Sequence, residues 1–302
     1  MWRRVLLASA ALAILGSGLP FTIADAHMKV DVLGAPAPAV LVGAGDISTC
    51  QSAGDTRTAN LIEDIPGTVF TAGDHVYPSG ALGDFEDCYE PTWGAFRNRT
   101  RPSPGNHDYE TVDALGYFAY FGSAAGEPGE GWYAYDLGAW RIYALNSNCA
   151  PVGGCGAGSP QLQWLTADLA ANPTRCIAAY WHHPLFSSGA HGNSPKVKPF
   201  WRALYAAGAD VIISGHDHDY ERFARQEPDG DRNAAGIREF VVGTGGAERR
   251  PFANIKPNSQ VRNATTFGVL KLTLHATSYD FRFVPQAGKS FTDSRNGVPC
   301  SD

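Results

Sequence analysis

The chain has 302 residues, of which 44% are hydrophobic and 18% charged, so its composition excludes a disordered or fibrous protein. Its length suits one large α/β domain or two modest ones. The formal net charge of -6 argues against a general binder of nucleic-acid backbones. It leaves room for a small phosphorylated substrate, because a metal site supplies local positive charge.

The first residues have the pattern of a signal peptide. Arg3 and Arg4 form a basic start, residues 5–15 are apolar, and the small residues around Ala26 form a cleavage site. The apolar stretch is short for a membrane span. We therefore expect residues 1–26 to be removed and the protein to be secreted or periplasmic, with an uncleaved anchor as the alternative.

The remaining chain is expected to form a Pro- and Ala-rich lead-in segment (27–38) and one folded domain (39–302). Apolar runs predict buried strands at 39–44, 68–72, 176–181, 211–213 and 239–242. Helices are predicted over 55–63, 84–98, 160–171 and 199–207. A hairpin is predicted at 132–146, and an antiparallel pair at 269–275 and 279–284. Strand–helix alternation followed by antiparallel strands is typical of an α/β protein with two sheets packed as a sandwich and covered by helices.

Six cysteines in an exported chain predict disulfides. Ligation of a metal by thiolates is the weaker alternative, because the sequence has no C-x-x-C pair. Sequence alone leaves the pairing open. We favour Cys149 with Cys155 across a tight loop, then Cys50 with Cys88, and then Cys176 with Cys300.

Five short polar motifs follow one another along the chain, and each except the third comes directly after an apolar run. They are Gly45-Asp46, Gly73-Asp74-His75-Val76-Tyr77, Gly105-Asn106-His107-Asp108, His182-His183-Pro184 and Gly215-His216-Asp217-His218. Because sites in open α/β sheets form at the carboxyl ends of strands, we expect these side chains to converge. Asp, Tyr, Asn and His together suit a cluster of metal ions.

Taken singly, most of the motifs have another interpretation. Asp46 could cap the following helix. Tyr77 could be an aromatic wall residue, since its phenol keeps its proton near neutral pH unless a strongly Lewis-acidic metal removes it. His216 and His218 could both face solvent.

Read jointly, the five motifs resemble those of the calcineurin-like metallophosphoesterases, and Gly-Asp-x-x-Tyr looks like the purple acid phosphatase branch. The flanking segments 187–189, 219–222 and 243–246 also look like that branch. The resemblance covers roughly residues 40–284. It implies a four-layer α/β/β/α fold and makes residues 39–302 a metallophosphoesterase catalytic domain.

The resemblance further implies two metal ions bridged by Asp74. It assigns Asp46, Tyr77 and His218 to the first metal, and Asn106, His182 and His216 to the second. His182 rather than His183 is the ligand by this pattern, which leaves His183 to packing or to contacts behind the ligands. The chain departs from this pattern beside the first metal, because Ser48 stands where the branch usually has Gly. A tyrosinate suits iron(III), with zinc, manganese or iron(II) beside it.

Three residues are expected to act on the substrate side of the site. His107 would be the general acid that protonates the leaving group, and Asp108 would hold its second nitrogen. His191 is the next candidate for substrate contact, with an exposed loop histidine as the alternative.

We expect a metal-dependent phosphomonoesterase in which a metal-activated hydroxide attacks a small phosphate ester. A phosphodiesterase with the same metals is one alternative, and a non-catalytic exported binding protein is another. We expect no nucleic-acid scaffold and no stable membrane anchor as partners. The oligomeric state stays open.

Overall fold

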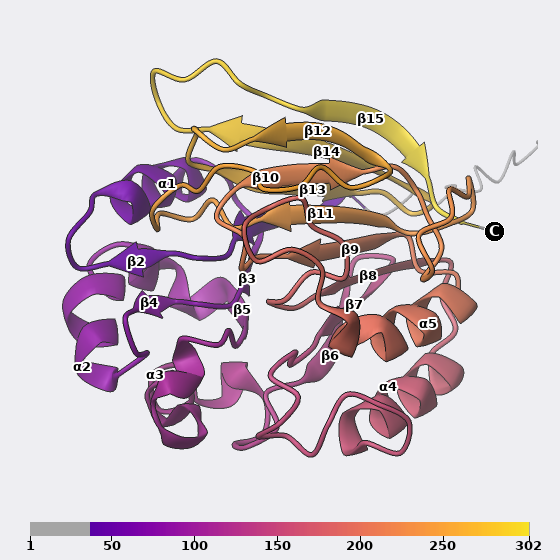
Figure 1. The fold of residues 1–302 in the computed structure, drawn as a ribbon, viewed down its shortest axis with the longest axis horizontal. Helices are drawn as coiled ribbons and strands as arrows, with labels where there is room; N and C mark the ends of the chain where they lie inside the picture. The colour runs from indigo at the N-terminus through magenta and orange to yellow at the C-terminus, as the bar shows by residue number, and fades with distance from the viewer. Residues whose placement is uncertain (1–36, 302) are drawn as a thin grey trace, which may run out of the picture. The chain divides into compact units, whose positions relative to one another are not determined.

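The computed structural model describes residues 37–301, which form two β-sheets packed face to face with helices on their outer sides (Figure 1). This architecture confirms the predicted α/β sandwich. The predicted signal peptide and most of the lead-in segment lie outside the described residues.

The first sheet has six strands, and its N-terminal strand lies inside it. In spatial order the strands are β15 (Ser294–Pro299), β14 (Ser278–Pro285), β13 (Gly268–Leu274), β1 (Ala39–Ala44), β3 (Thr68–Ala72) and β5 (Thr100–Ser103). β1 pairs in parallel with β3 and antiparallel with β13. β3 and β5 are also parallel, so the strands that precede the first three motifs end at one edge.

The second sheet has seven strands. In spatial order they are β12 (Ser259–Asn263), β10 (Tyr220–Phe223), β11 (Arg238–Val242), β9 (Val211–Ser214), β8 (Cys176–Tyr180), β7 (Trp140–Ala144) and β6 (Tyr133–Leu137). The strands β7, β8, β9 and β11 run parallel. A small parallel pair, β2 (Ser48–Thr49) and β4 (Val76–Tyr77), follows the first two motif strands.

Side chains that alternate between the two faces of each buried strand explain how one face packs against the other sheet and the opposite face against helices. In β8 every residue is buried, and successive side chains point to opposite faces. Ile177 and Ala179 pack under the helices α4 (Pro160–Ala171) and α5 (Lys198–Ala206). Tyr180 faces the other sheet, where its ring lies 5.6 Å from that of Phe70. On the outer side of the first sheet, α1 (Gly54–Glu63) contacts β13.

The helix predicted over 84–98 is wrong as a single element. The chain forms α2 (Leu82–Asp84), a π-helical turn η1 (Phe85–Tyr89) and a 3-10 helix η2 (Trp93–Arg99). Pro91 separates the last two, because proline lacks the N–H that a continuous helix needs there. The other short helices are η3 (Asp108–Glu110), η4 (Val112–Ala114), α3 (Leu115–Phe121), η5 (Gly122–Ala125) and η6 (Pro195–Val197).

All three favoured disulfides are confirmed. They join Cys50 to Cys88, Cys149 to Cys155 and Cys176 to Cys300. Across the described part of the chain, every helix is too short or too polar to cross a lipid bilayer.

Candidate metal centre

Four of the predicted ligands follow the carboxyl ends of parallel strands. Asp46 comes after β1 and Asp74 after β3, while His182 follows β8 and His216 follows β9. Direct contacts join the two sheets here, since the His216 amide donates to Asp46 Oδ2 (2.8 Å) and His182 Nδ1 donates to the carbonyl of Ala72 (2.8 Å). The strand ends therefore deliver carboxylates and imidazoles to one place.

Three of these residues are bent sharply by their own backbone. Asp46, Asp74 and His216 have left-handed φ angles of 60°, 51° and 70°, which non-glycine residues seldom adopt. Gly105 packs directly against Asp74, and a larger residue would collide there. A Cβ on Gly105 would lie 2.1 Å from Asp74 Oδ1. The turns thus direct side chains into a space that only glycine leaves open.

Tyr77 is the centre of the first group of predicted ligands. Its hydroxyl oxygen lies 2.9 Å from Asp46 Oδ1, 3.1 Å from Asp74 Oδ2 and 3.1 Å from His218 Nε2. His218 donates through Nδ1 to the carbonyl of Glu248 (2.7 Å), so its Nε2 is the atom that faces this group.

His182 is the centre of the second group. Its Nε2 lies 3.0 Å from Asn106 Oδ1, 3.2 Å from Asp74 Oδ2 and 3.1 Å from His216 Nδ1. Asp74 Oδ2 contacts both Tyr77 and His182, so it joins the two groups. The structure therefore brings all seven predicted ligands together.

These spacings fit metal ions. Ligand atoms at right angles on a cation with bonds of about 2.1 Å lie about 3.0 Å apart, which matches the observed separations. A triad of Asp46, Asp74 and His182 has donor atoms within 4.8 Å of one another, and His182, His183 and His216 form a second such triad. The donor atoms are oxygens of carboxylate, phenol and amide groups and nitrogens of imidazole rings. Such a set suits iron, zinc and manganese.

Electrostatics at the site also fit a cation. Burial lowers the pKa of His182, but Asp74 and then Asp46 outweigh it and raise that pKa to about 9. Burial and the charge on His182 lower the pKa of the adjacent His216 to about 3. The buried carboxylates of Asp46 and Asp74 thus favour positive charge at this place, which a metal cation supplies when bound. Burial, Asp46 and Asp74 all raise the pKa of Tyr77, so its phenol needs a Lewis-acidic metal to lose the proton.

His107 lies beside the first group, but the predicted contact between its ring and Asp108 is wrong. Its ring centroid lies 4.4 Å from that of Tyr77, and its backbone amide donates to Asp74 Oδ1 (2.8 Å). Its Nδ1 donates to the carbonyl of Pro78 (2.5 Å), and not to Asp108. This contact leaves Nε2 as the ring nitrogen that is not engaged by Pro78.

Asp108 instead supports the backbone of the second motif. It accepts hydrogen bonds from the amides of Asp74 (3.1 Å) and Gly105 (2.8 Å), and from His75 Nδ1 (2.9 Å). Its side chain turns back into the protein because Asp108 begins the short helix η3 and is fully buried. His75, which sequence reasoning passed over, is buried too and bonds Thr71 Oγ1 through Nε2 (2.6 Å).

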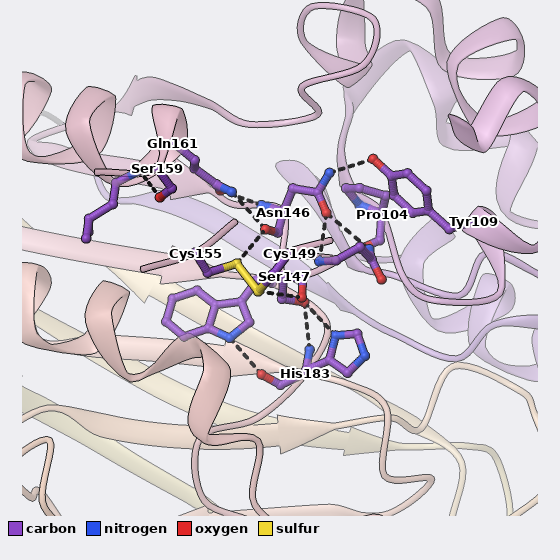
Figure 2. Close-up of a disulfide and its surroundings, with 12 residues drawn as sticks. Pro104, Tyr109, Asn146, Ser147, Cys149, Cys155, Ser159, Gln161 and His183 are labelled. Atoms are coloured by element: carbon purple, nitrogen blue, oxygen red, sulfur yellow. Dashed lines mark hydrogen bonds between the residues drawn. A yellow bond between two sulfur atoms is a disulfide. The ribbon is translucent and has the colours of Figure 1, made fainter. Parts of the chain in front are cut away.

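His183 lies behind the second group, in the network beside the Cys149–Cys155 disulfide shown in Figure 2. Its Nδ1 lies 2.8 Å from Ser147 Oγ, which also accepts from the His183 amide (3.0 Å). Burial lowers the pKa of His183 far below its usual value, and the charge on His182 lowers it further. In the same network Asn146 Nδ2 donates to Tyr109, which follows the third motif (2.7 Å).

His191 lies over the second group. Its ring stacks on that of His216 with centroids 4.3 Å apart, and burial lowers its pKa. Arg250 Nη1 donates to His191 Nε2 (2.7 Å), which places a guanidinium at the rim of the site. The carboxylate of Asp217 holds the loop, since it accepts from the amides of His191 (2.7 Å) and Gly192 (3.2 Å).

Arg250 and Asp217 are the residues that sequence reasoning missed. Asp217 had a signal, because it stands between the two histidines of His-x-His and is fully buried. Arg250 had none, since it lies 59 residues from His191 along the chain.

Known proteins that resemble this chain are named as phosphatases. A model of the calcineurin-like phosphoesterase family matches residues 23–220, more than half of the chain. Purple acid phosphatase 15 of Arabidopsis thaliana is 26% identical over 259 residues, which cover 73% of this chain and 48% of that protein. Acid phosphatase type 7 of Homo sapiens is 29% identical over 231 residues, 64% of this chain and 52% of that protein. The chain thus spans about half the length of these relatives.

Solved structures share the fold. The purple acid phosphatase PPD1 from yellow lupin superposes with a TM-score of 0.65 at 18% identity, covering 88% of this chain and 54% of that one. GAP50 of Plasmodium, described as the anchor in the inner membrane complex, also gives a TM-score of 0.65, at 14% identity, covering 88% and 90%. The chain belongs to the calcineurin-like phosphoesterase family, and within it resembles the purple acid phosphatases.

Proposed function

We propose that the chain is an exported phosphomonoesterase of the acid phosphatase type that works with two metal ions. The observation that supports this proposal is the convergence of seven donor side chains from both sheets, with donor atoms 2.9–3.3 Å apart. Asp46, Tyr77 and His218 would hold one ion, Asn106, His182 and His216 the other, and Asp74 would contact both. When bound, such a pair supplies positive charge to the phosphoryl oxygens and acidifies a water nucleophile.

The residues around this centre have separate tasks in the proposed reaction. His107, held through Nδ1 by Pro78, would give the proton on Nε2 to the leaving oxygen of the ester. His191 and Arg250 would bind phosphoryl oxygens from the side of the second group. Because a terminal phosphate carries more negative charge than a diester, the guanidinium at the rim favours a monoester substrate.

The metal content and the substrate class can be tested together. Purified protein should contain close to two metal ions per chain, with iron accompanied by zinc, manganese or more iron. Chelation should abolish phosphate release, and a panel of mono- and diesters across pH should show monoesters turned over faster. Full activity without metal would contradict the proposal, and faster turnover of diesters would make the protein a phosphodiesterase. A protein that holds metal but hydrolyses neither class would be a binding protein with this fold.

The three disulfides support export, since such bonds persist in oxidising compartments. N-terminal sequencing of the exported protein tests whether residues 1–26 are removed. The mature protein should begin at His27.

A further inference from the structure

A pocket lined by arginine lies between strands of the second sheet and β15 of the first sheet, away from the candidate metal centre. Its volume is about 350 Å³, and Arg225, Arg232, Arg238 and Arg295 line it; we call it the arginine pocket. Its lining, which lies entirely within the described residues, includes no Asp or Glu. The whole chain carries a net charge of -6, so this concentration of positive charge runs against the overall balance.

The sheet topology separates the two sites. Arg238 opens β11 and pairs with Val211 at the start of β9, while His216 comes just after the end of β9. At about 3.3 Å per residue, the two positions lie roughly 15 Å apart along the strand direction. Arg225 follows the end of β10, which runs antiparallel to β11, so it lies at the same end as Arg238. The arginine pocket is therefore at the opposite end of the parallel strands from the metal ligands.

Two of the arginines are fixed by backbone carbonyls. Arg225 donates to Ala234 through Nη1 (3.1 Å) and to Pro299 through Nη2 (2.5 Å). Arg238 donates to Phe223 through Nη1 (2.9 Å). Neutral carbonyls orient these guanidinium groups without cancelling their charge. The Nε atom of Arg225 is buried and has no hydrogen-bond partner among the described residues.

The other two arginines are exposed. The guanidinium groups of Arg232 and Arg295 form no ion pair or hydrogen bond within the described part of the chain. Their charges are therefore available to a ligand.

Acidic groups near the arginine pocket only partly balance it, and one of them, Glu227, accepts from Nδ2 of the lining residue Asn233 (2.7 Å). Asp210 lies 3.9 Å from Arg225 Nη2. It already accepts hydrogen bonds from the amides of Ile177 (3.1 Å) and Ser301 (2.6 Å), and burial raises its pKa to about 6.

The cations of this region also act on one another. Burial lowers the pKa of Arg238, and the neighbouring Arg222 and Arg225 lower it further, although Tyr279 acts in the opposite direction. Arg222 is already paired with Asp293 (2.6 Å), so Arg225 and Arg238 are the like charges whose proximity a bound anion would offset.

We propose that the arginine pocket binds a multivalent oxyanion, a ligand with two or more phosphate-like groups. Guanidinium groups match the oxygens of such groups two at a time. The volume is at the lower end of the range for small-molecule pockets and exceeds what one tetrahedral oxyanion fills. This site is independent of the proposed phosphoesterase activity.

The test uses 1,2-ethanedisulfonate, which has two tetrahedral oxyanion groups and no bond that a phosphatase hydrolyses. Calorimetric titration of the whole protein should show one saturable site whose affinity falls as salt rises. Arg232→Gln and Arg295→Gln should each weaken binding roughly five- to tenfold, because each removes a charge-assisted contact. Arg57→Gln, on the exposed side of α1, removes the same charge elsewhere and should leave the affinity unchanged.

Two further measurements locate the ligand. Hydrogen exchange should slow in residues 232–238 and 294–299 when the disulfonate binds, and ester hydrolysis by the two pocket variants should match the parent protein. Equal weakening by Arg57→Gln would overturn the proposal in favour of general charge attraction. Unchanged binding in the pocket variants, together with competitive inhibition of hydrolysis, would place the anion at the metal centre and also overturn it. If the parent protein hydrolyses no ester, that result contradicts the proposed function and not the proposal for the arginine pocket.

Discussion

Asp46, Asp74 and His216 occupy a backbone region that costs on the order of 1–3 kcal/mol for each non-glycine residue. The surrounding hydrogen bonds hold them there: the amide of His216 donates to Asp46, and the amides of Asp74 and His107 are bound by Asp108 and Asp74 respectively. Among the described residues, Asp113, Ala114 and Asn258 also have left-handed φ angles, so three of the six such non-glycine residues are ones that the proposed function uses.

Arg250 is expected to discriminate between esters by charge. Replacement by Gln removes the rim cation while keeping a side chain that can donate to His191. We expect KM for an aryl phosphate monoester to rise roughly tenfold, with a smaller rise for the matching diester, because the dianion is attracted more strongly. Steady-state kinetics on both esters measures the difference, and Arg57→Gln is the charge-matched control. Equal changes in KM for the two esters would contradict this role.

Sequence could predict most of the site at this scale, because each ligand except Asn106 stands directly after an apolar run or within a short distance of one. The partner of His107 could not be predicted. Asp108 is its neighbour in sequence, yet it begins η3 and turns toward His75, while Pro78 from another loop accepts from His107. Adjacent side chains in a turn point in different directions, and the sequence alone does not show the direction of each one.

The loop between β8 and η6 shows how an element outside the sheets shapes the site. Its residues 187–192 contact the segment between β9 and β10 through Asp217, whose Oδ2 also accepts from Ser187 Oγ (2.5 Å). A Cβ on Gly189 would lie 2.3 Å from the Asp217 carboxyl carbon, so glycine is required for this approach. The loop that presents His191 is therefore anchored by the residue between two predicted metal ligands.

Asp217 is expected to act through His191. Asp217→Asn replaces one acceptor oxygen with an NH2 group that faces donors, so the loop should loosen. We expect kcat/KM to fall roughly tenfold with the metal content retained. A double-mutant cycle checks the route: Asp217→Asn added to His191→Ala should cost little more than His191→Ala alone. Additive losses, or loss of metal in the single variant, would instead give Asp217 a structural role.

Among the elements, the apolar strands could be predicted and the polar ones could not. β1, β3, β8 and β9 are largely apolar because both of their faces are covered, and β11 ends in the apolar run Phe240–Val242. β12 and β15 consist largely of polar, partly exposed residues, and pairing with a neighbouring strand rather than burial makes them strands. β10 (Tyr-Glu-Arg-Phe) is buried although two of its four residues are charged.

At the scale of the whole molecule, the Cys176–Cys300 disulfide ties β8 to the C-terminal end of the described chain. It closes a loop with a sequence separation of 124, against 6 for Cys149–Cys155. β8 leads directly to His182, so this bond anchors the base of a strand that supplies a predicted ligand.

Removal of the two disulfides should have unequal effects on stability. In the chain-entropy description, loss of Cys176–Cys300 costs about 5 kcal/mol and loss of Cys149–Cys155 about 2 kcal/mol, because the longer loop restricts the unfolded chain more. The paired Cys→Ala variants allow the comparison by urea denaturation. A larger loss for Cys149–Cys155 would show that its contacts near Ser147 and Asn146 outweigh loop length.

The position of β1 within the first sheet sets an order of events during synthesis. This strand leaves the ribosome well before its antiparallel partner β13, which follows about 220 residues later in the chain. Until then one side of β1 has unpaired backbone groups, and Asp46 lacks the amide of His216 that holds it. An incomplete chain should therefore stay open and available to chaperones, which is compatible with the proposed export, in which the site would assemble after the chain has crossed a membrane.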